Sequence, residues 1–305
     1  MKRYSHICLC LASLPAFALC GCNTFQIPMP DVGNVPASID LPNQDQTIPF
    51  QFVNGYVLLT GHVGTAGPFT FVLDTGAGAS VVSPAIAQTL PQDFTGTTTI
   101  ISSVDPNSVS TKFIRVENIS IGSVQFQNLQ AAILPPIVLQ SSGRSITIDG
   151  ILGIQLFRNL LLTVDYGADT VRLSQGSLSA ADNCLVLPVT RSDGDLLLID
   201  LDVAGRSVGA IVDTGNNEFL LLPSSFSNLP WSGPTHVGSA TTVTGNLTTT
   251  VGTLDGNVNL GCIHVISPQL TVAGGVASLG SGLFSQFILS IDQNAGVLQL
   301  EQAAQ

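Results

Sequence analysis

Two aspartates stand in the same short motif in the two halves of this 305-residue chain. Asp74-Thr75-Gly76 and Asp213-Thr214-Gly215 each follow an apolar run that ends at the aspartate. A carboxyl group in such a place is a candidate general acid or base, because its surroundings can shift its pKa. One copy would be weak evidence, since strands often end in a tight Asp-Gly turn. Two copies in matched surroundings favour a site built from both.

The segments that lead into the two motifs follow the same order. Asn54-Gly55 supplies the two positive-φ residues of a type I′ turn and predicts a hairpin around it. The elements expected in the first half are strands at 47–53 and 56–63, a turn at 64–68 and a strand at 69–73. Those expected in the second half are a strand at 196–203, a turn at 204–207 and a strand at 208–212.

The segments after the motifs repeat as well. Ile151-Leu152-Gly153 and Ser278-Leu279-Gly280 each precede a short apolar stretch and two further strands. These strands are expected at 162–165 and 171–173 in the first half, and at 289–292 and 297–300 in the second. Gly153 and Gly280 are 127 residues apart, as are Asp165 and Asp292. An internal duplication explains this spacing most economically.

Over roughly residues 47–302, these motifs resemble the retropepsin-like and pepsin-like aspartic proteases. The resemblance implies an all-β fold in which two tandem retropepsin-like β-barrel lobes form a pepsin-like bilobal molecule with a cleft between the lobes. The expected units are a first lobe at 47–176, a linker at 177–184 and a second lobe at 185–302. The implied function is that of an aspartic endopeptidase, which acts as a monomer on a polypeptide substrate and uses no cofactor.

In that family each lobe contributes one catalytic aspartate, which makes Asp74 and Asp213 the expected pair. At about 3 Å and an effective dielectric constant near 20, two carboxylates repel by about 5 kcal/mol. One of them must therefore keep a proton. The ionised carboxylate takes a proton from a water molecule, while the protonated one donates to the scissile carbonyl, so that water attacks directly.

Supporting roles follow from the resemblance one position at a time. Thr75 and Thr214 match the threonines that exchange hydrogen bonds across the lobes. Gly76 and Gly215 match the glycines that bring backbone N–H groups toward the carboxylates. Gly153 and Gly280 belong to the segments that pack beneath each active-site loop. The segments 98–113 and 238–252 are the candidate flaps over an extended substrate.

The second copy departs from the family pattern at two positions. Asn216 stands where Ala, Ser or Thr is usual, and Ser278 stands where an aliphatic residue is expected. The alternative function is therefore a catalytically inactive, protease-derived binding or scaffolding lipoprotein. The feature that separates the two readings is whether Asn216 and Ser278 leave Asp213 facing Asp74.

The first residues predict export and lipidation. Lys2 and Arg3 precede a 13-residue apolar run, too short to span a bilayer comfortably but suited to a secretory signal. Leu19-Cys20-Gly21-Cys22 follows and resembles the bacterial lipobox. We expect residues 1–21 to be removed, Cys22 to be lipidated and 22–46 to form a flexible tether. The expected location is the bacterial cell envelope facing the periplasm, at the outer membrane rather than the inner one, since Asn23 is not Asp.

Composition excludes several other functions. The chain has only two lysines, and the part after residue 21 carries a formal charge of 7 − 20 = −13, which argues against nucleic-acid binding. Gly205-Arg-Ser-Val-Gly209 matches the serine-hydrolase pattern, but a strand follows Ser207 where a helix is needed. The spacing of His62, His236 and His264 predicts no metal site. Cys184 and Cys262 form either one disulfide or two buried free thiols.

Overall fold

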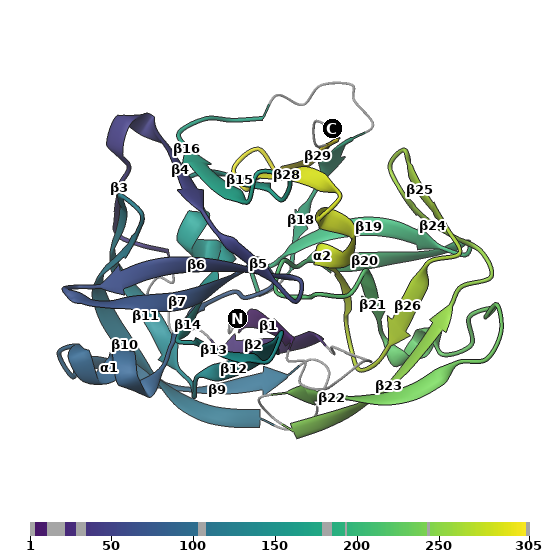
Figure 1. Ribbon diagram of the computed structural model, residues 1–305, viewed down its shortest axis with the longest axis horizontal. Helices are drawn as coiled ribbons and strands as arrows, with labels where there is room; N and C mark the ends of the chain where they lie inside the picture. The colour runs from purple at the N-terminus through teal and green to yellow at the C-terminus, as the bar shows by residue number, and fades with distance from the viewer. Residues whose placement is uncertain are drawn as a thin grey trace.

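The computed structural model describes residues 4–10, 22–28, 35–102, 108–178, 185–192, 194–242 and 245–302. Within these ranges nearly all regular structure is strand, and the α-helices are α1 (Pro84–Thr89) and α2 (Ser281–Phe284). Figure 1 shows two β lobes side by side, the first at the left and the second at the right. The predicted all-β, two-lobed fold class is confirmed. No helix in the described ranges is long and apolar enough to cross a membrane.

The first lobe is built on an 11-stranded sheet. In sheet order its strands are β1 (Tyr4–Cys10), β2 (Cys22–Pro28), β9 (Phe94–Ser102), β10 (Ser108–Ile121), β11 (Val124–Ile133), β8 (Ser80–Val82), β14 (Gly150–Gly153), β7 (Ala66–Asp74), β6 (Tyr56–Val63) and β5 (Gln51–Val53), with β3 (Ser38–Asp40) paired to β11. Because β10 pairs with β6 as well, the sheet closes on itself as a barrel does.

The second lobe is built on a 10-stranded sheet. Its strands in order are β22 (His236–Thr242), β23 (Gly245–Thr253), β26 (Gln269–Val272), β21 (Leu220–Leu222), β27 (Ala277–Leu279), β20 (Arg206–Val212), β19 (Leu197–Val203), β24 (Asn257–Leu260) and β25 (Ile263–Ile266), with β18 (Thr190–Arg191) paired to β19. The order β21-β27-β20 repeats the order β8-β14-β7 of the first lobe. The strands that end in the two Asp-Thr-Gly motifs therefore occupy equivalent places.

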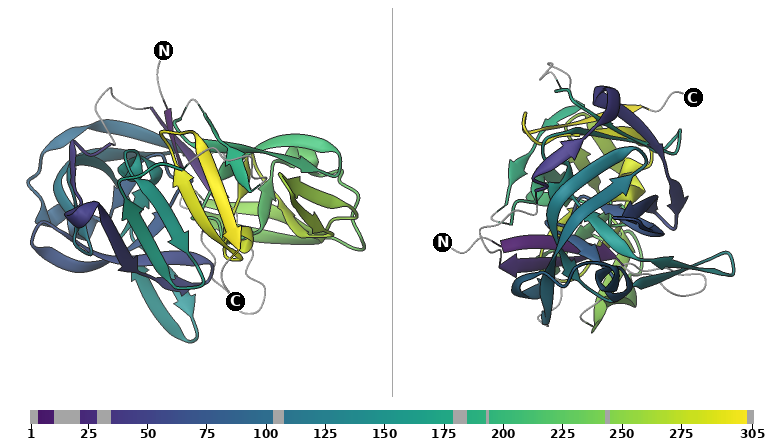
Figure 2. Two further views of the ribbon diagram at one scale, coloured as in Figure 1. Left: turned by 90° about the horizontal axis from the view of Figure 1, so that it is seen from above. Right: turned by 90° about the vertical axis from the view of Figure 1, so that its left-hand side faces the viewer.

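A third sheet joins the lobes. Its order is β17 (Val186–Pro188), β29 (Val297–Gln302), β28 (Phe287–Asp292), β15 (Leu161–Asp165), β16 (Thr170–Ser174) and β4 (Asp45–Pro49). Seen from above, β28 and β29 lie between the lobes (Figure 2). Thr163 and Ser290 are directly opposite across β15 and β28, and they are 127 residues apart, the spacing of the duplication. The pseudo-two-fold axis thus passes between these two residues.

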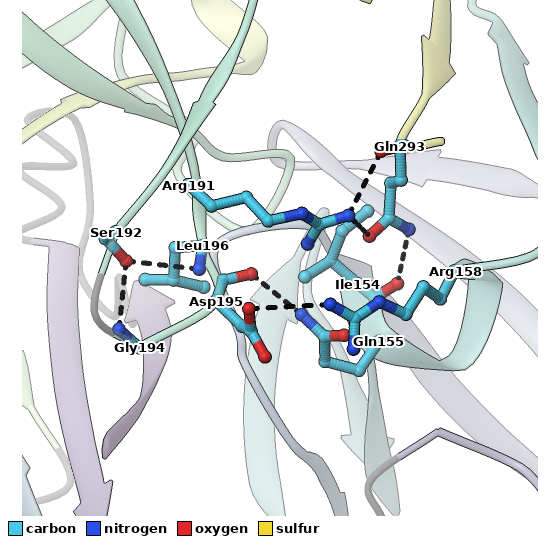
Figure 3. A network of polar contacts seen from close by, with 9 residues as sticks. All are labelled: Ile154, Gln155, Arg158, Arg191, Ser192, Gly194, Asp195, Leu196 and Gln293. Atoms are coloured by element: carbon cyan, nitrogen blue, oxygen red, sulfur yellow. Dashed lines mark hydrogen bonds and ion pairs between the residues drawn. The ribbon is translucent and has the colours of Figure 1, made fainter. Parts of the chain in front are cut away.

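A polar network also ties the lobes together (Figure 3). It starts from the 3-10 helix η2 (Ile154–Phe157) of the first lobe. Gln155 Nε2 donates to the carbonyl of Asp195 at 2.7 Å, and Gln293 Nε2 donates to the carbonyl of Ile154 at 2.9 Å. Arg191 donates to the backbone and side-chain oxygens of Gln293. The main apolar cluster contains buried residues of both lobes, so they pack as one unit.

The segment predicted as a flexible tether, 22–46, has strands at both ends, since Cys22–Pro28 is β2 and Ser38–Asp40 is β3. Ser38–Asp40 pairs with β11, Leu41 is buried in the core, and β4 begins at Asp45. A short 3-10 helix, η1 (Pro42–Gln44), joins these strands. The proline-rich composition concealed them, because strands this short carry no readable periodicity. The folded part therefore begins before residue 47.

One hairpin has no counterpart among the predicted elements. It consists of β12 (Ile137–Ser141) and β13 (Arg144–Ile148), and it is inserted between β11 and β14 of the first lobe. The second lobe has only β26 and a turn at the equivalent point, while its 3-10 helix η3 (Ser224–Phe226) stands where α1 stands in the first lobe. The hairpin is thus an addition to one copy of the duplicated unit.

Candidate active site

The two Asp-Thr-Gly turns meet at the interface between the lobes. The amide of Thr75 donates to Thr214 Oγ1 at 3.1 Å, and the amide of Thr214 donates to Thr75 Oγ1 at 3.0 Å. Each hydroxyl then donates across the interface at 2.7 Å, Thr75 to the carbonyl of Val212 and Thr214 to that of Leu73. Both threonines have no exposed surface. Four reciprocal hydrogen bonds therefore fix one turn against the other.

This arrangement brings the two aspartates together. The carboxyls of Asp74 and Asp213 lie close enough to shift each other's pKa, and both are fully buried. The amide of Gly76 donates to Asp74 Oδ1 at 2.9 Å, and that of Gly215 donates to Asp213 Oδ1 at 3.0 Å. A Cβ on Gly215 would lie 2.4 Å from the Asp74 carboxyl carbon, so only glycine permits the contact.

Burial raises the pKa of both carboxyls. The charge of Asp213 raises the pKa of Asp74 further. For Asp213, hydrogen bonds from Ser278, Asp74 and the backbone oppose the effect of burial, and its pKa is raised to about 7. The Oδ2 atom of Asp74 is buried without a hydrogen-bond donor within the described ranges. The two carboxyls thus differ in their side-chain donors, since Asp213 accepts from Ser278 as well as from the amide of Gly215.

The two departures in the second copy lie against Asp213. Ser278 Oγ donates to Asp213 Oδ2 at 2.6 Å. The side-chain amide of Asn216 donates to Ser278 Oγ at 3.0 Å and to the Ser278 carbonyl at 3.1 Å. Asn216, Ser278 and Asp213 therefore form one chain of hydrogen bonds.

Gly153 and Gly280 lie beneath the two turns. A Cβ on Gly153 would stand 2.7 Å from the carbonyl oxygen of Ala77, and one on Gly280 would stand 2.5 Å from that of Asn216. Such distances are shorter than a Cβ tolerates, so any other residue would push the turn above it. These glycines therefore allow the two Asp-Thr-Gly turns to pack closely on the strands beneath them.

A small cavity adjoins Asp74. Its volume is about 10 Å³, which is enough for one water molecule. Its lining comes from both lobes and from the added hairpin, and consists of Tyr56, Val72, Asp74, Ile137, Leu139, Ile148 and Gly215. Tyr56 and the hairpin residues were not among the predicted site residues. The hairpin packs its buried Leu139 and Ile148 against this end of the site.

The candidate flaps fall in two hairpins, β9–β10 and β22–β23. Residues 103–107 and 243–244, at their tips, lie outside the described ranges. Strand β1 runs close to β7 and β22. The segments 98–113 and 238–252 thus belong to one hairpin in each lobe, as a pair of flaps requires.

The remaining predicted residues are elsewhere. Ser207 lies exposed in β20, and the described ranges contain no group of His, Cys, Asp and Glu that could hold a metal. Cys262 is disulfide-bonded, while Cys184 lies outside the described residues. Cys22 is the first residue of β2, and its lipidation stays a prediction.

Comparisons with known proteins match part of the first lobe to a known family. Residues 59–156, about a third of the chain, match the family described as aspartyl protease. The matched segment includes Asp74 and Gly153, and it supports an aspartic protease family for this chain. Among solved structures, the crystal structure of basic 7S globulin from soybean is similar, with a TM-score of 0.47 and 11% sequence identity over 85% of this chain and 95% of that chain. No curated protein sequence matches the chain.

Proposed function

We propose that the protein is an aspartic endopeptidase of the two-lobed, pepsin-like type, and that Asp74 and Asp213 form its catalytic pair. The observation that carries this proposal is the burial of two electrostatically coupled carboxyls where four reciprocal hydrogen bonds join the lobes. Burying two acids together is costly for folding, since each resists ionisation there. Such a pair is typical of a site selected for chemistry rather than for stability.

The chemistry is hydrolysis of a peptide bond by water. Asp213, as the carboxylate, takes a proton from a water molecule whose oxygen bonds to the carbonyl carbon. The carbonyl oxygen receives the proton of Asp74, which leaves a neutral gem-diol, an ionised Asp74 and a protonated Asp213. When the C–N bond breaks, the nitrogen takes the proton of Asp213, and a diol hydroxyl returns its proton to Asp74. The pair is then restored, and one water molecule has been added across the bond.

The substrate in this proposal is an extended polypeptide. The hairpins β9–β10 and β22–β23 belong to opposite lobes, and we propose that their strand edges pair with the peptide backbone. The cavity beside Asp74 is lined mainly by apolar side chains, which favours neutral or apolar residues next to the scissile bond. Because both carboxyls are buried, a peptide reaches them only after the surrounding elements move apart.

Both aspartates and both lobes come from one chain, so we propose that the enzyme acts as a monomer. Dilution should leave its specific activity unchanged, whereas a protease assembled from two chains loses activity on dilution. We also propose that Cys22 carries the lipid that anchors it to the envelope on the periplasmic side. The motif Leu19-Cys20-Gly21-Cys22 supports this placement.

The decisive experiment compares three variants in a peptide-library assay across pH. Asp74→Asn, Asp213→Asn and the double variant should each lose about 10²–10⁴-fold in kcat/KM, because either aspartate is ineffective alone. Asp165→Asn is the control, since its carboxylate accepts backbone amides in a turn after β15. Near-normal cleavage by Asp213→Asn at any pH would reject the paired mechanism. Binding of peptides without cleavage by the wild type would instead favour the scaffolding alternative.

A further inference from the structure

The lobes differ at two equivalent positions next to the aspartates. In the first lobe, Ile151 pairs with Val72, two residues before Asp74. In the second, Ser278 pairs with Ile211, two residues before Asp213. Ala77 and Asn216 likewise occupy the same place after each Asp-Thr-Gly motif. An apolar pair in one lobe is thus replaced by a polar pair in the other, around backbones in the same register.

In the second lobe, each hydrogen bond of the Asn216–Ser278 pair fixes the direction of the next one. The amide of Glu218 donates to Asn216 Oδ1 at 2.9 Å, which turns the Asn216 side-chain NH₂ toward Ser278. Because that NH₂ donates to Ser278 Oγ, the serine uses its own single proton elsewhere. That proton goes to Asp213 Oδ2 at 2.6 Å. A charge-assisted bond of this length favours a carboxylate at Asp213.

Asp74 lacks the side-chain hydrogen-bond donor that Asp213 has. The backbone amides of Gly76 and Ala77 act on Asp74 as those of Gly215 and Asn216 act on Asp213. The side chains of Ala77 and Ile151, however, offer no hydrogen-bond donor, and Asp74 Oδ2 is buried without a donor within the described ranges. An ionised carboxyl there would lack both solvent and a hydrogen bond at that atom. A proton on Asp74 instead allows it to donate in its contact with Asp213.

Resting on the proposed function, we infer that Ser278, held by Asn216, is a positioning residue that keeps Asp213 as the carboxylate and leaves Asp74 as the proton donor. The asymmetry between the aspartates is therefore built into the second lobe by two residues that depart from its family pattern. The base that activates water belongs to the second lobe, and the acid that protonates the carbonyl belongs to the first.

Two isosteric variants test this assignment. Ser278→Thr keeps the hydroxyl, whereas Ser278→Val has the same shape without it, and Ile151 shows that a β-branched residue suits this position in the equivalent strand. The acid limb of the kcat/KM profile for a cleaved peptide should lie about one to two pH units higher in Ser278→Val than in Ser278→Thr. Ile151→Val, the matched control in the first lobe, should leave the acid limb in place.

A second readout does not depend on activity. Carbon-13 NMR of carboxyl-labelled aspartate in the Asp74→Asn background follows the titration of Asp213 in the full mature chain. Adding Ser278→Val should raise its midpoint by the same one to two pH units, and adding Ser278→Thr should not. Identical midpoints and identical acid limbs for the two variants would overturn the inference. A wild type without peptidase activity would reject the proposed function alone, and the titration would then decide the role of Ser278.

Discussion

Replacing Thr75 by valine tests the junction of the lobes directly, because the change keeps the shape of the side chain and removes only its hydroxyl. That hydroxyl donates to the carbonyl of Val212 and accepts from the amide of Thr214, and both groups are fully buried. Each group left without a partner costs about 1–3 kcal/mol. Thr75→Val should therefore lower the free energy of unfolding by about 2–6 kcal/mol. This is a large share of the 5–15 kcal/mol typical of a whole domain.

Thr75→Ser is the matched control, since it keeps both hydrogen bonds and removes one methyl group, at about 1 kcal/mol. Urea unfolding followed by fluorescence of Trp231, the single tryptophan of the chain, measures both variants. The kcat of Thr75→Val should fall more than its KM changes, because the aspartates lose their fixed separation while no substrate contact is removed. If valine and serine prove equally stable and equally active, the four-bond junction does not hold the pair and the reasoning fails.

Three further predictions concern the buried charge, the added hairpin and the anchor. Because burial raises the pKa of Asp213 from 3.8 to about 7, its contribution to stability is complete below pH 3.8 and is lost as the pH rises through 7. Asp213→Asn should thus raise the free energy of unfolding by about 4 kcal/mol at pH 8 and hardly at all at pH 3, and an equal gain at both would contradict this. Leu139→Ala, in the buried lining of the cavity, should lower KM for peptides, whereas exposed Val138→Ala should leave it unchanged in steady-state kinetics. Cys22→Ser should release the protein from membrane fractions or block signal cleavage while Cys20→Ser does not, and wild-type fractionation of the Cys22 variant would refute lipidation there.

Much of the fold could be predicted because its signals are local. The hairpin around Asn54 and Gly55 depends on two consecutive positive φ angles, and the structure has 52° and 86° there. The strands that end at Asp74 and Asp213 were predicted from apolar runs stopped by turn residues, and β7 and β20 match them. The duplication was visible as a constant spacing, and the pairing of Thr163 with Ser290 gives it a geometric meaning.

The hairpin β12–β13 shows where such reasoning stops. Its sequence carries a readable turn signal in Ser142-Gly143, and both residues have positive φ in the structure. What the turn signal does not reveal is the surface that the apolar face of the hairpin covers. Leu139 and Ile148 pack beside Asp74, a contact set by the insertion of the hairpin into a closed barrel rather than by any neighbour in sequence. The closure of the site was therefore beyond prediction.

Contacts between residues distant in sequence also decide how the departures of the second lobe, Asn216 and Ser278, are interpreted. Taken one position at a time, Asn216 and Ser278 are each a departure from the family pattern and each argues for lost function. In the structure they are one feature, because the amide of Asn216 needs the acceptor that Ser278 provides, and the hydroxyl of Ser278 needs the carboxylate of Asp213. An aliphatic residue at 278 would leave a buried amide without this partner, and an alanine at 216 would leave the serine proton free to rotate. The two departures therefore act through one chain of hydrogen bonds that ends on Asp213.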